Sequence, residues 1–266
     1  MSTSTNEDLK SQYLSLLDEQ HKEQVYQDFI EQHTGLIPRM FVQNHGVHFG
    51  LVLRKLPFGA DYKSDFFFFS KSSIDWHAVL IEIEKPSSRY FKPNSNEISS
   101  EFQKAIHQIK TWEAWLNDQA NAAGFLASLS TLQVPAHMAR HPTTFKFILV
   151  HGRRAEIENS PQRKQLVKSY ETPNFKIMSF DSLAENLNGN CALNIGVRHN
   201  EFIDVLGDEI CDGQMVAWME PTHLRVSKAL HDVLKAGSVA PKQVSMQNGK
   251  RVDSWVKASE TIRVRK

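Results

Sequence analysis

The spacing of apolar residues divides the first part of the chain into helical and extended segments. Residues 7–33 carry two apolar stripes at helical spacing, one around Tyr13 and one around Phe29. Gly35 and Pro38 follow, and both residue types end helices. The pattern therefore predicts one helix, or two consecutive helices, at the start of the chain.

A strand pattern replaces the helical one after this point. Residues 40–53 mix apolar side chains with glycines, which indicates short strands. The apolar runs Phe66–Phe69 and Ala78–Ile81 are separated by a polar turn at 71–75, and Pro86 ends the second run. We expect a hairpin that leads into a buried strand.

Further helices and strands alternate in the next hundred residues. Ser100 and Gln103 are spaced as a capping box, ahead of a long apolar stripe from Phe102 to Leu116. The remaining elements predicted before residue 188 are a helical pattern over 118–132, strands at 145–150 and 175–180, a helix that begins at Ser160-Pro161, and a short helix capped by Ser182 and Glu185. This order of elements predicts an α/β fold with a mixed sheet.

The turn-forming sequence Asn188-Gly189-Asn190 marks a junction. Beyond it we expect a strand over 214–219 and a helix over 224–234, capped by Thr222 and ended by Gly237. The sequence thus suggests three parts: an N-terminal helical segment (1–36), a core (37–187) and a C-terminal extension without an assigned role (188–266).

Composition narrows the class of protein. The chain has 266 residues, of which 41% are hydrophobic and 23% charged, so disordered, collagen-like and coiled-coil proteins are excluded. Two cysteines are too few for a disulfide scaffold or a four-cysteine zinc site. No apolar run approaches the roughly 18–20 residues of a membrane span, and the first ten residues are polar. We therefore expect a cytoplasmic protein without a membrane partner.

Charge is unevenly distributed although the formal net charge is only +1. Residues 1–35 hold seven acidic and two basic side chains, whereas residues 140–168 hold seven basic and two acidic ones, and the C-terminal tail is also basic. A basic middle and tail could contact phosphate. Ordinary solvated faces explain the same pattern, and charge alone favours that reading.

Three carboxylates stand out at the end of the predicted hairpin. Glu82 and Glu84 are two residues apart and so point to one face of a strand, while Asp65 heads the neighbouring arm. Carboxylates that converge at a sheet edge need a positive charge between them, and Mg²⁺ suits oxygen ligands of this kind. The alternative is a solvated strand end, which the common Glu-x-Glu spacing by itself favours.

The wider context resembles the PD-(D/E)XK nuclease superfamily and, within it, the Shedu family of bacterial anti-phage defence proteins. The matching segments are Gly59–Phe69 (GADYKSDFFFF), Leu80–Pro86 (LIEIEKP), Ala105–Leu116 (AIHQIKTWEAWL), Phe147–Arg154 (FILVHGRR) and Ile177–Leu183 (IMSFDSL). The resemblance covers roughly residues 20–187 and implies a restriction-endonuclease-like mixed sheet flanked by helices.

The resemblance also implies roles for individual residues. Asp65 and Glu82 would be ligands of Mg²⁺ or Mn²⁺. Glu84 stands where the superfamily usually has a lysine, and it would serve as a further ligand or as a general base. Lys85 is adjacent, but it faces the other side of an ideal strand. Gln108 would reach the active site from its helix, and the alternative is a polar residue beside an apolar stripe.

Arg153, Arg154 and Lys164 are the candidate contacts to nucleic acid, since Arg153 follows Gly152 as in the family's Gly-Arg pair. A structural salt bridge is the other interpretation of these arginines.

The implied activity is hydrolysis of phosphodiester bonds in DNA by a homo-oligomer, a dimer or tetramer. The resemblance also implies an assembly that keeps its nuclease restrained. The acidic N-terminal segment could contribute to this restraint by covering basic surface. Two other functions remain open: a nucleic-acid-binding sensor that has lost cleavage through Glu84, and an oligomerising accessory protein.

Overall fold

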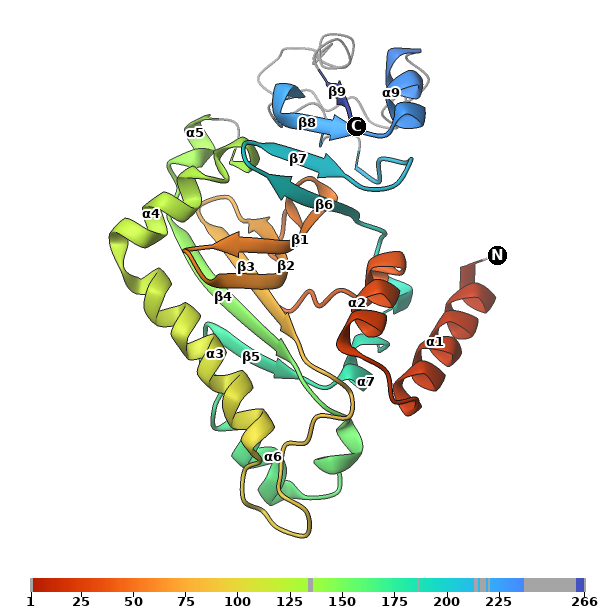
Figure 1. The fold of residues 1–266 in the computed structure, drawn as a ribbon, viewed down its shortest axis with the longest axis vertical. Coiled ribbons are helices and arrows are strands. Elements are labelled where there is room, and N and C mark those ends of the chain that lie inside the picture. The colour runs from red at the N-terminus through yellow and green to blue at the C-terminus, as the bar shows by residue number, and fades with distance from the viewer. Residues whose placement is uncertain are drawn as a thin grey trace. The chain divides into compact units, whose positions relative to one another are not determined.

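A computed structural model describes residues 2–133, 136–185, 187–212, 215, 219, 221–236 and 262–265. In this part of the chain, nine strands form one mixed sheet in the order β5-β4-β3-β2-β1-β6-β7-β8-β9 (Figure 1). Helices accompany the sheet, so the predicted α/β class is confirmed. Within the described residues, every helix is too short or too polar to cross a membrane.

Contacts along the chain group it into two compact units, and each unit combines three segments. The first unit consists of Met1–Phe41, Val79–Gln119 and Phe145–Ala192. The second unit consists of Val42–Ala78, Ala120–Thr144 and Leu193–Lys266. The division of the chain at residues 36 and 187 stays a prediction.

The first unit holds most of the long helices. Its elements are α1 (Ser2–Asp18), α2 (Glu23–Gln32), α3 (Ser100–Asn117), α6 (Pro161–Lys168), α7 (Phe180–Leu183), β5 (Phe175–Met178) and most of β3 (Trp76–Ile83) and β4 (Thr143–Val150). Strands β4 and β5 are parallel, with Phe147 opposite Phe175 and Val150 opposite Met178.

Helix α3 forms because its apolar residues recur on one face. Phe102, Ala105, Ile109 and Trp112 are each at most 1% exposed, as the stripe predicts. Figure 1 shows α3 running along β4 and β5. The cap differs from the prediction by one residue, because Ser99 Oγ accepts the Phe102 N–H at 3.0 Å and Ser99, not Ser100, has the extended backbone of an N-cap.

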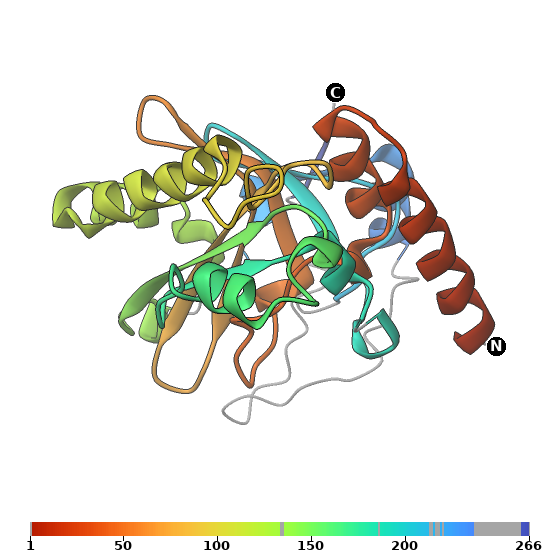
Figure 2. The same cartoon turned by 90° about the horizontal axis from the view of Figure 1, so that it is seen from below.

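The predicted N-terminal helical region is two helices, α1 and α2, which lie side by side (Figure 2). Tyr13 of α1 is fully buried, and its hydroxyl donates to the Phe180 carbonyl oxygen at 3.1 Å. Helix α1 is therefore packed into its unit through its apolar stripe.

The helix expected from Ser182 is misplaced. Helix α7 spans Phe180–Leu183 with Ser179 at its N-cap position, so Ser182 lies inside it. The Ser182 and Glu185 spacing imitates a capping box, but burial of Phe180 and Leu183 fixes an earlier start.

The second unit is mainly strands. Its elements are β1 (Leu51–Phe58), β2 (Tyr62–Lys71), α4 (Gln119–Ala127), α5 (Ala136–Ala139), β6 (Asn194–His199), β7 (Phe202–Val205), β8 (Leu224–Val226), α9 (Lys228–Lys235) and β9 (Arg263–Val264). Strand β1 pairs antiparallel with β2 and parallel with β6. The predicted strand over Phe66–Phe69 is part of β2, and because these four residues are each at most 2% exposed, it is buried on both faces.

Two predictions for this unit need correction. Residues 40–50 form a 3-10 turn at His48–Gly50 and isolated bridges, and a strand begins only at Leu51. The predicted helix over 224–234 begins later, as α9, because Ser227 rather than Thr222 accepts an N–H from the first helical turn. Leu224 and Val226 are both buried in strand β8 instead. The strand predicted over 214–219 and Gly237 lie largely outside the described residues.

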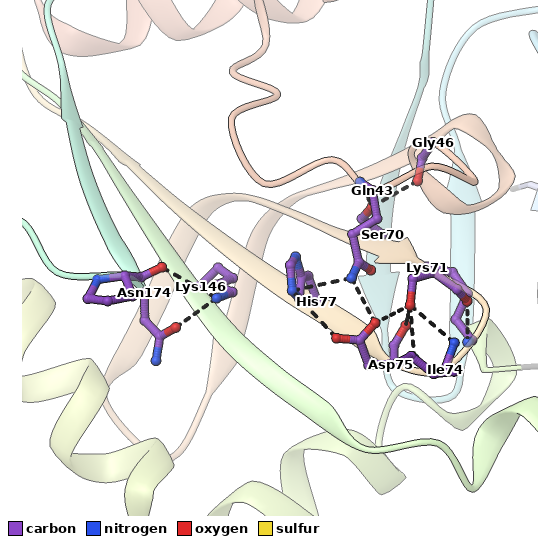
Figure 3. Close-up of polar contacts among 11 residues, drawn as sticks. Gln43, Gly46, Ser70, Lys71, Ile74, Asp75, His77, Lys146 and Asn174 are labelled. Carbon is purple, nitrogen blue, oxygen red and sulfur yellow. Dashed lines mark hydrogen bonds and ion pairs between the residues drawn. The ribbon is translucent and has the colours of Figure 1, made fainter.

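Side chains around the β2–β3 turn form a polar cluster (Figure 3). Gln43 Nε2 donates to Asp75 Oδ1 at 2.9 Å, and the Gln43 N–H donates to Ser70 Oγ at 2.6 Å. Ser70 Oγ in turn donates to the Gly46 carbonyl oxygen at 3.0 Å. These bonds tie residues 43–46 to the predicted turn. In the first unit, Lys146 donates to Asn174 Oδ1 at 2.7 Å (Figure 3).

His151 makes the fold sensitive to acid. It follows β4, is fully buried between the rings of Tyr90 and Phe102, and donates from Nε2 to the Arg89 carbonyl oxygen at 3.3 Å. Burial lowers the pKa of His151 from 6.5 to about 4. Below pH 6.5 the unfolded chain therefore binds a proton that the folded chain does not bind until about pH 4.

We predict that the free energy of unfolding falls between pH 6.5 and 4, with roughly 3 kcal/mol of the loss due to His151. His151→Phe should reduce this decrease in the free energy of unfolding, as measured by urea melts at several pH values. His107→Gln, which removes an exposed histidine of α3, should leave the loss unchanged. An unaltered pH dependence in His151→Phe would contradict this assignment.

Candidate active site

Glu82 and Gln108, predicted from separate motifs, meet in the first unit. Glu82 is the last residue but one of β3, and its Oε1 accepts a hydrogen bond from Gln108 Nε2 at 2.5 Å. Gln108 is half-buried and adjoins the apolar stripe of α3. Packing of that stripe directs the amide towards the strand, so the polar flank of the helix becomes a contact of the carboxylate.

Glu84 and Lys85 follow the end of β3 directly. The Glu84 N–H donates to the Val150 carbonyl oxygen at 3.0 Å, so the ladder between β3 and β4 continues to residue 84. The Lys85 carbonyl oxygen accepts the Ser88 N–H at 3.0 Å, which places Lys85 at the start of a turn. Both side chains are half-buried. Their roles in chemistry stay predictions.

Asp65 lies on β2 in the second unit, and its side chain is only 7% exposed. Lys55 Nζ on the neighbouring strand β1 forms an ion pair with Asp65 Oδ1. A charged side chain is rarely this buried unless another group meets its charge. The structure thus shows that the Asp65 carboxylate accepts a cationic partner.

The convergence of the three carboxylates stays a prediction, because Asp65 belongs to the second unit and Glu82 and Glu84 to the first. Among the side chains that the structure describes, no group of three or more His, Cys, Asp and Glu residues could hold a metal ion. The donor chemistry nevertheless fits Mg²⁺ or Mn²⁺. Carboxylate oxygens are the ligands of hard cations, and Asp65 already contacts a positive charge.

Arg153 and Arg154 contact acidic side chains of their own unit. Arg153 pairs with Asp18 of α1 at 2.7 Å and with Asp181 of α7 at 3.0 Å, and Arg154 pairs with Glu185. Burial alone would raise the pKa of Asp181, but hydrogen bonds from Arg153 and the Arg154 N–H hold it below its usual value. The geometry shows the salt bridges that the sequence left as an alternative.

Lys164 is exposed on α6, where a nucleic acid can reach it. The predicted contacts of Lys164, Arg153 and Arg154 with nucleic acid remain untested by the structure.

Lys55 pairs with a candidate site residue but was not itself predicted from the sequence. It belongs to no motif and precedes Asp65 by ten positions in an ordinary mixed segment. The antiparallel register brings the two together, because Arg54 lies opposite Phe66 and Leu56 opposite Ser64. Recognition of an antiparallel hairpin with these boundaries would have placed Lys55 opposite Asp65.

No curated protein sequence matches this chain. One family does match, described as "Shedu protein SduA, C-terminal", over residues 20–184. This range contains Asp65, Glu82, Glu84 and Gln108. Because the match covers more than half of the sequence, the chain belongs to the Shedu family, and this membership indicates a role in anti-phage defence.

Proposed function

We propose that this chain is a Mg²⁺- or Mn²⁺-dependent endonuclease that hydrolyses phosphodiester bonds of DNA in anti-phage defence. The hydrogen bond from Gln108 to Glu82 carries the proposal. Two residues that the nuclease resemblance assigns to one active site, 26 positions apart, meet at bonding distance. Membership of the Shedu family supports the same conclusion.

Each residue takes a specific part in the proposed reaction. Asp65 and Glu82 hold the ion, and Gln108 keeps the Glu82 carboxylate in position. Glu84 orders the attacking water or adds a further ligand. When bound, the ion makes water a better nucleophile and stabilises the charge on the leaving oxygen. Lys85, at the start of the next turn, stays a secondary candidate.

DNA would be bound through basic side chains of the first unit. Lys164 is exposed and available to phosphate, whereas the guanidinium groups of Arg153 and Arg154 form ion pairs with acidic side chains of the same unit. The pairing of Asp18 with Arg153 also fits the expectation that the acidic N-terminal segment covers basic surface. We further propose that the protein acts as a homo-oligomer, a dimer or tetramer, in the cytoplasm.

A second candidate function follows from Glu84. Glutamate in the usual place of a lysine removes a positive charge from the reacting phosphate, and a protein so changed would bind nucleic acid without cutting it. Such a sensor, or an oligomerising accessory protein, would keep the fold and lose the metal-dependent reaction.

Cleavage of DNA should depend on metal and on the two proposed ligands. We expect the purified protein to nick or degrade circular and linear double-stranded DNA with Mg²⁺ or Mn²⁺ but not with EDTA. Asp65→Asn and Glu82→Gln should each lower the rate by at least about 100-fold, since each removes a charged metal ligand at constant size. Gel assays with time courses measure this.

Glu97→Gln provides the matched control, because Glu97 is 69% exposed and pairs only at the surface with Lys92. Its cleavage rate should equal that of the wild type. DNA binding without cleavage, unaffected by Asp65→Asn, would instead establish the sensor. If the wild type neither binds nor cleaves DNA, both the nuclease and the sensor are excluded.

Gln108 should act through Glu82. Gln108→Leu removes the amide and should lower the cleavage rate about 10–100-fold, with a higher Mn²⁺ concentration for half-maximal rate. Gln103→Leu, an exposed position of the same helix, should have little effect. Equal effects of the two substitutions would remove Gln108 from the site.

Substitution of Arg153 should affect the stability of the fold, whereas substitution of Lys164 should affect DNA binding. Arg153→Gln leaves the half-buried Asp181 carboxylate without its guanidinium and should lower the free energy of unfolding by about 1–2 kcal/mol. Lys164→Gln should leave the melting temperature unchanged and weaken DNA binding, with a smaller salt dependence. Thermal melts and gel shifts at several salt concentrations measure both. Unchanged DNA affinity in Lys164→Gln would exclude Lys164 from the interface.

A further inference from the structure

The carboxylate of Asp65 lies in an unusual environment for an ion. Its side chain is 7% exposed, it follows the fully buried Ser64, and the four phenylalanines of β2 come directly after it. Removing a carboxylate from water to this extent is unfavourable unless a positive charge compensates. In the structure, the Lys55 ammonium group supplies that charge.

The backbone of β1 is distorted at the residue that supplies the ammonium group. Lys55 has φ +47°, in the left-handed region that side chains other than glycine rarely adopt. The other described non-glycine residues with positive φ, which are Phe49, Asn94 and Asn200, lie outside strands, whereas Lys55 lies inside one. Register pairs continue on both sides of it. Backbone strain held within a regular strand is typical of functional sites.

The two members of the ion pair differ in their access to water. The Lys55 side chain is 37% exposed, whereas that of Asp65 is 7% exposed. The ammonium group ends a flexible four-carbon chain and is readily hydrated, so it can leave without a change in the fold. The carboxylate cannot leave, because it is fixed on a buried strand. Asp65 is therefore a fixed anionic site with an exchangeable cation.

We propose that Lys55 is the resident counter-ion of Asp65 and that a divalent cation displaces it. Without metal, the ammonium group neutralises the buried carboxylate. When Mg²⁺ or Mn²⁺ binds Asp65, the ammonium group moves into water, and metal and lysine compete for the same oxygen atoms. Lys55 is thus a positioning residue that sets the metal affinity. This inference rests on the proposed function, because it takes Asp65 as a metal ligand.

The test is Mn²⁺ binding to the full chain, measured by thermal melting over a Mn²⁺ titration. Without metal, Lys55→Gln should melt several degrees below the wild type, because Asp65 loses its counter-ion. Its affinity for Mn²⁺ should nevertheless be about tenfold higher, the factor that corresponds to roughly 1.4 kcal/mol. Lys55→Arg retains the charge and should bind Mn²⁺ no more tightly than the wild type. A lysine with a purely structural role would lower stability without raising metal affinity.

Lys63→Gln is the matched control, because Lys63 is an exposed lysine on the adjacent strand β2. It should leave both the melting temperature and the Mn²⁺ affinity unchanged. Asp65→Asn should abolish the Mn²⁺-induced rise in melting temperature, which shows that the ion measured is the one at this site.

A second measurement uses the wild type alone and does not depend on the folding of a variant. Mn²⁺ should increase the rate at which an amine-reactive reagent labels Lys55, relative to Lys63, as quantified by mass spectrometry. Mn²⁺ stabilisation of the wild type with equal affinity in Lys55→Gln, or with unchanged labelling of Lys55, would overturn this inference alone. A wild type that neither binds Mn²⁺ nor cleaves DNA would overturn the proposed function as well.

Discussion

A strand that is buried on both faces can carry a charged side chain only where another polar group meets that charge. This constraint shapes strand β2, whose phenylalanines are buried and whose Asp65 forms an ion pair with Lys55. It also applies to the end of β3, where Glu82 follows a fully buried run and accepts a hydrogen bond from Gln108. Both carboxylates are retained at a cost in solvation, and the surrounding elements are arranged to compensate it.

The compensating groups come from elements that a purely structural argument would assign to packing. Helix α3 packs through its apolar stripe, yet the residue beside the stripe fixes the direction of Glu82. Strand β1 contributes apolar residues to its unit, yet it tolerates a left-handed residue where it faces Asp65. Together with Shedu membership, the buried carboxylates and the strained backbone favour a functional site over an ordinary solvated strand end. Elsewhere in the same unit, Arg153 joins α1 to α7 through ion pairs with two carboxylates.

The sequence predicts long periodic elements well and residues at boundaries less well. The stripe of α3 and the apolar run of β2 are confirmed because each is set by burial over many residues. The start of a helix was misjudged at Ser100, Ser182 and Thr222, because serine and threonine near a helix start are common in sequences and packing decides where the helix begins. The contact of Glu82 with Gln108 was foreseeable from motif order, whereas Lys55 depends on strand register, which periodicity does not specify.

The most direct test of a metal ion shared by Asp65 and Glu82 is its position in crystals grown with Mn²⁺, located by anomalous scattering. We expect a peak within bonding distance of carboxylate oxygens of both residues, with Lys55 Nζ moved away from Asp65. Absence of a peak at these carboxylates at saturating Mn²⁺, with Lys55 still paired to Asp65, would rule out this metal site.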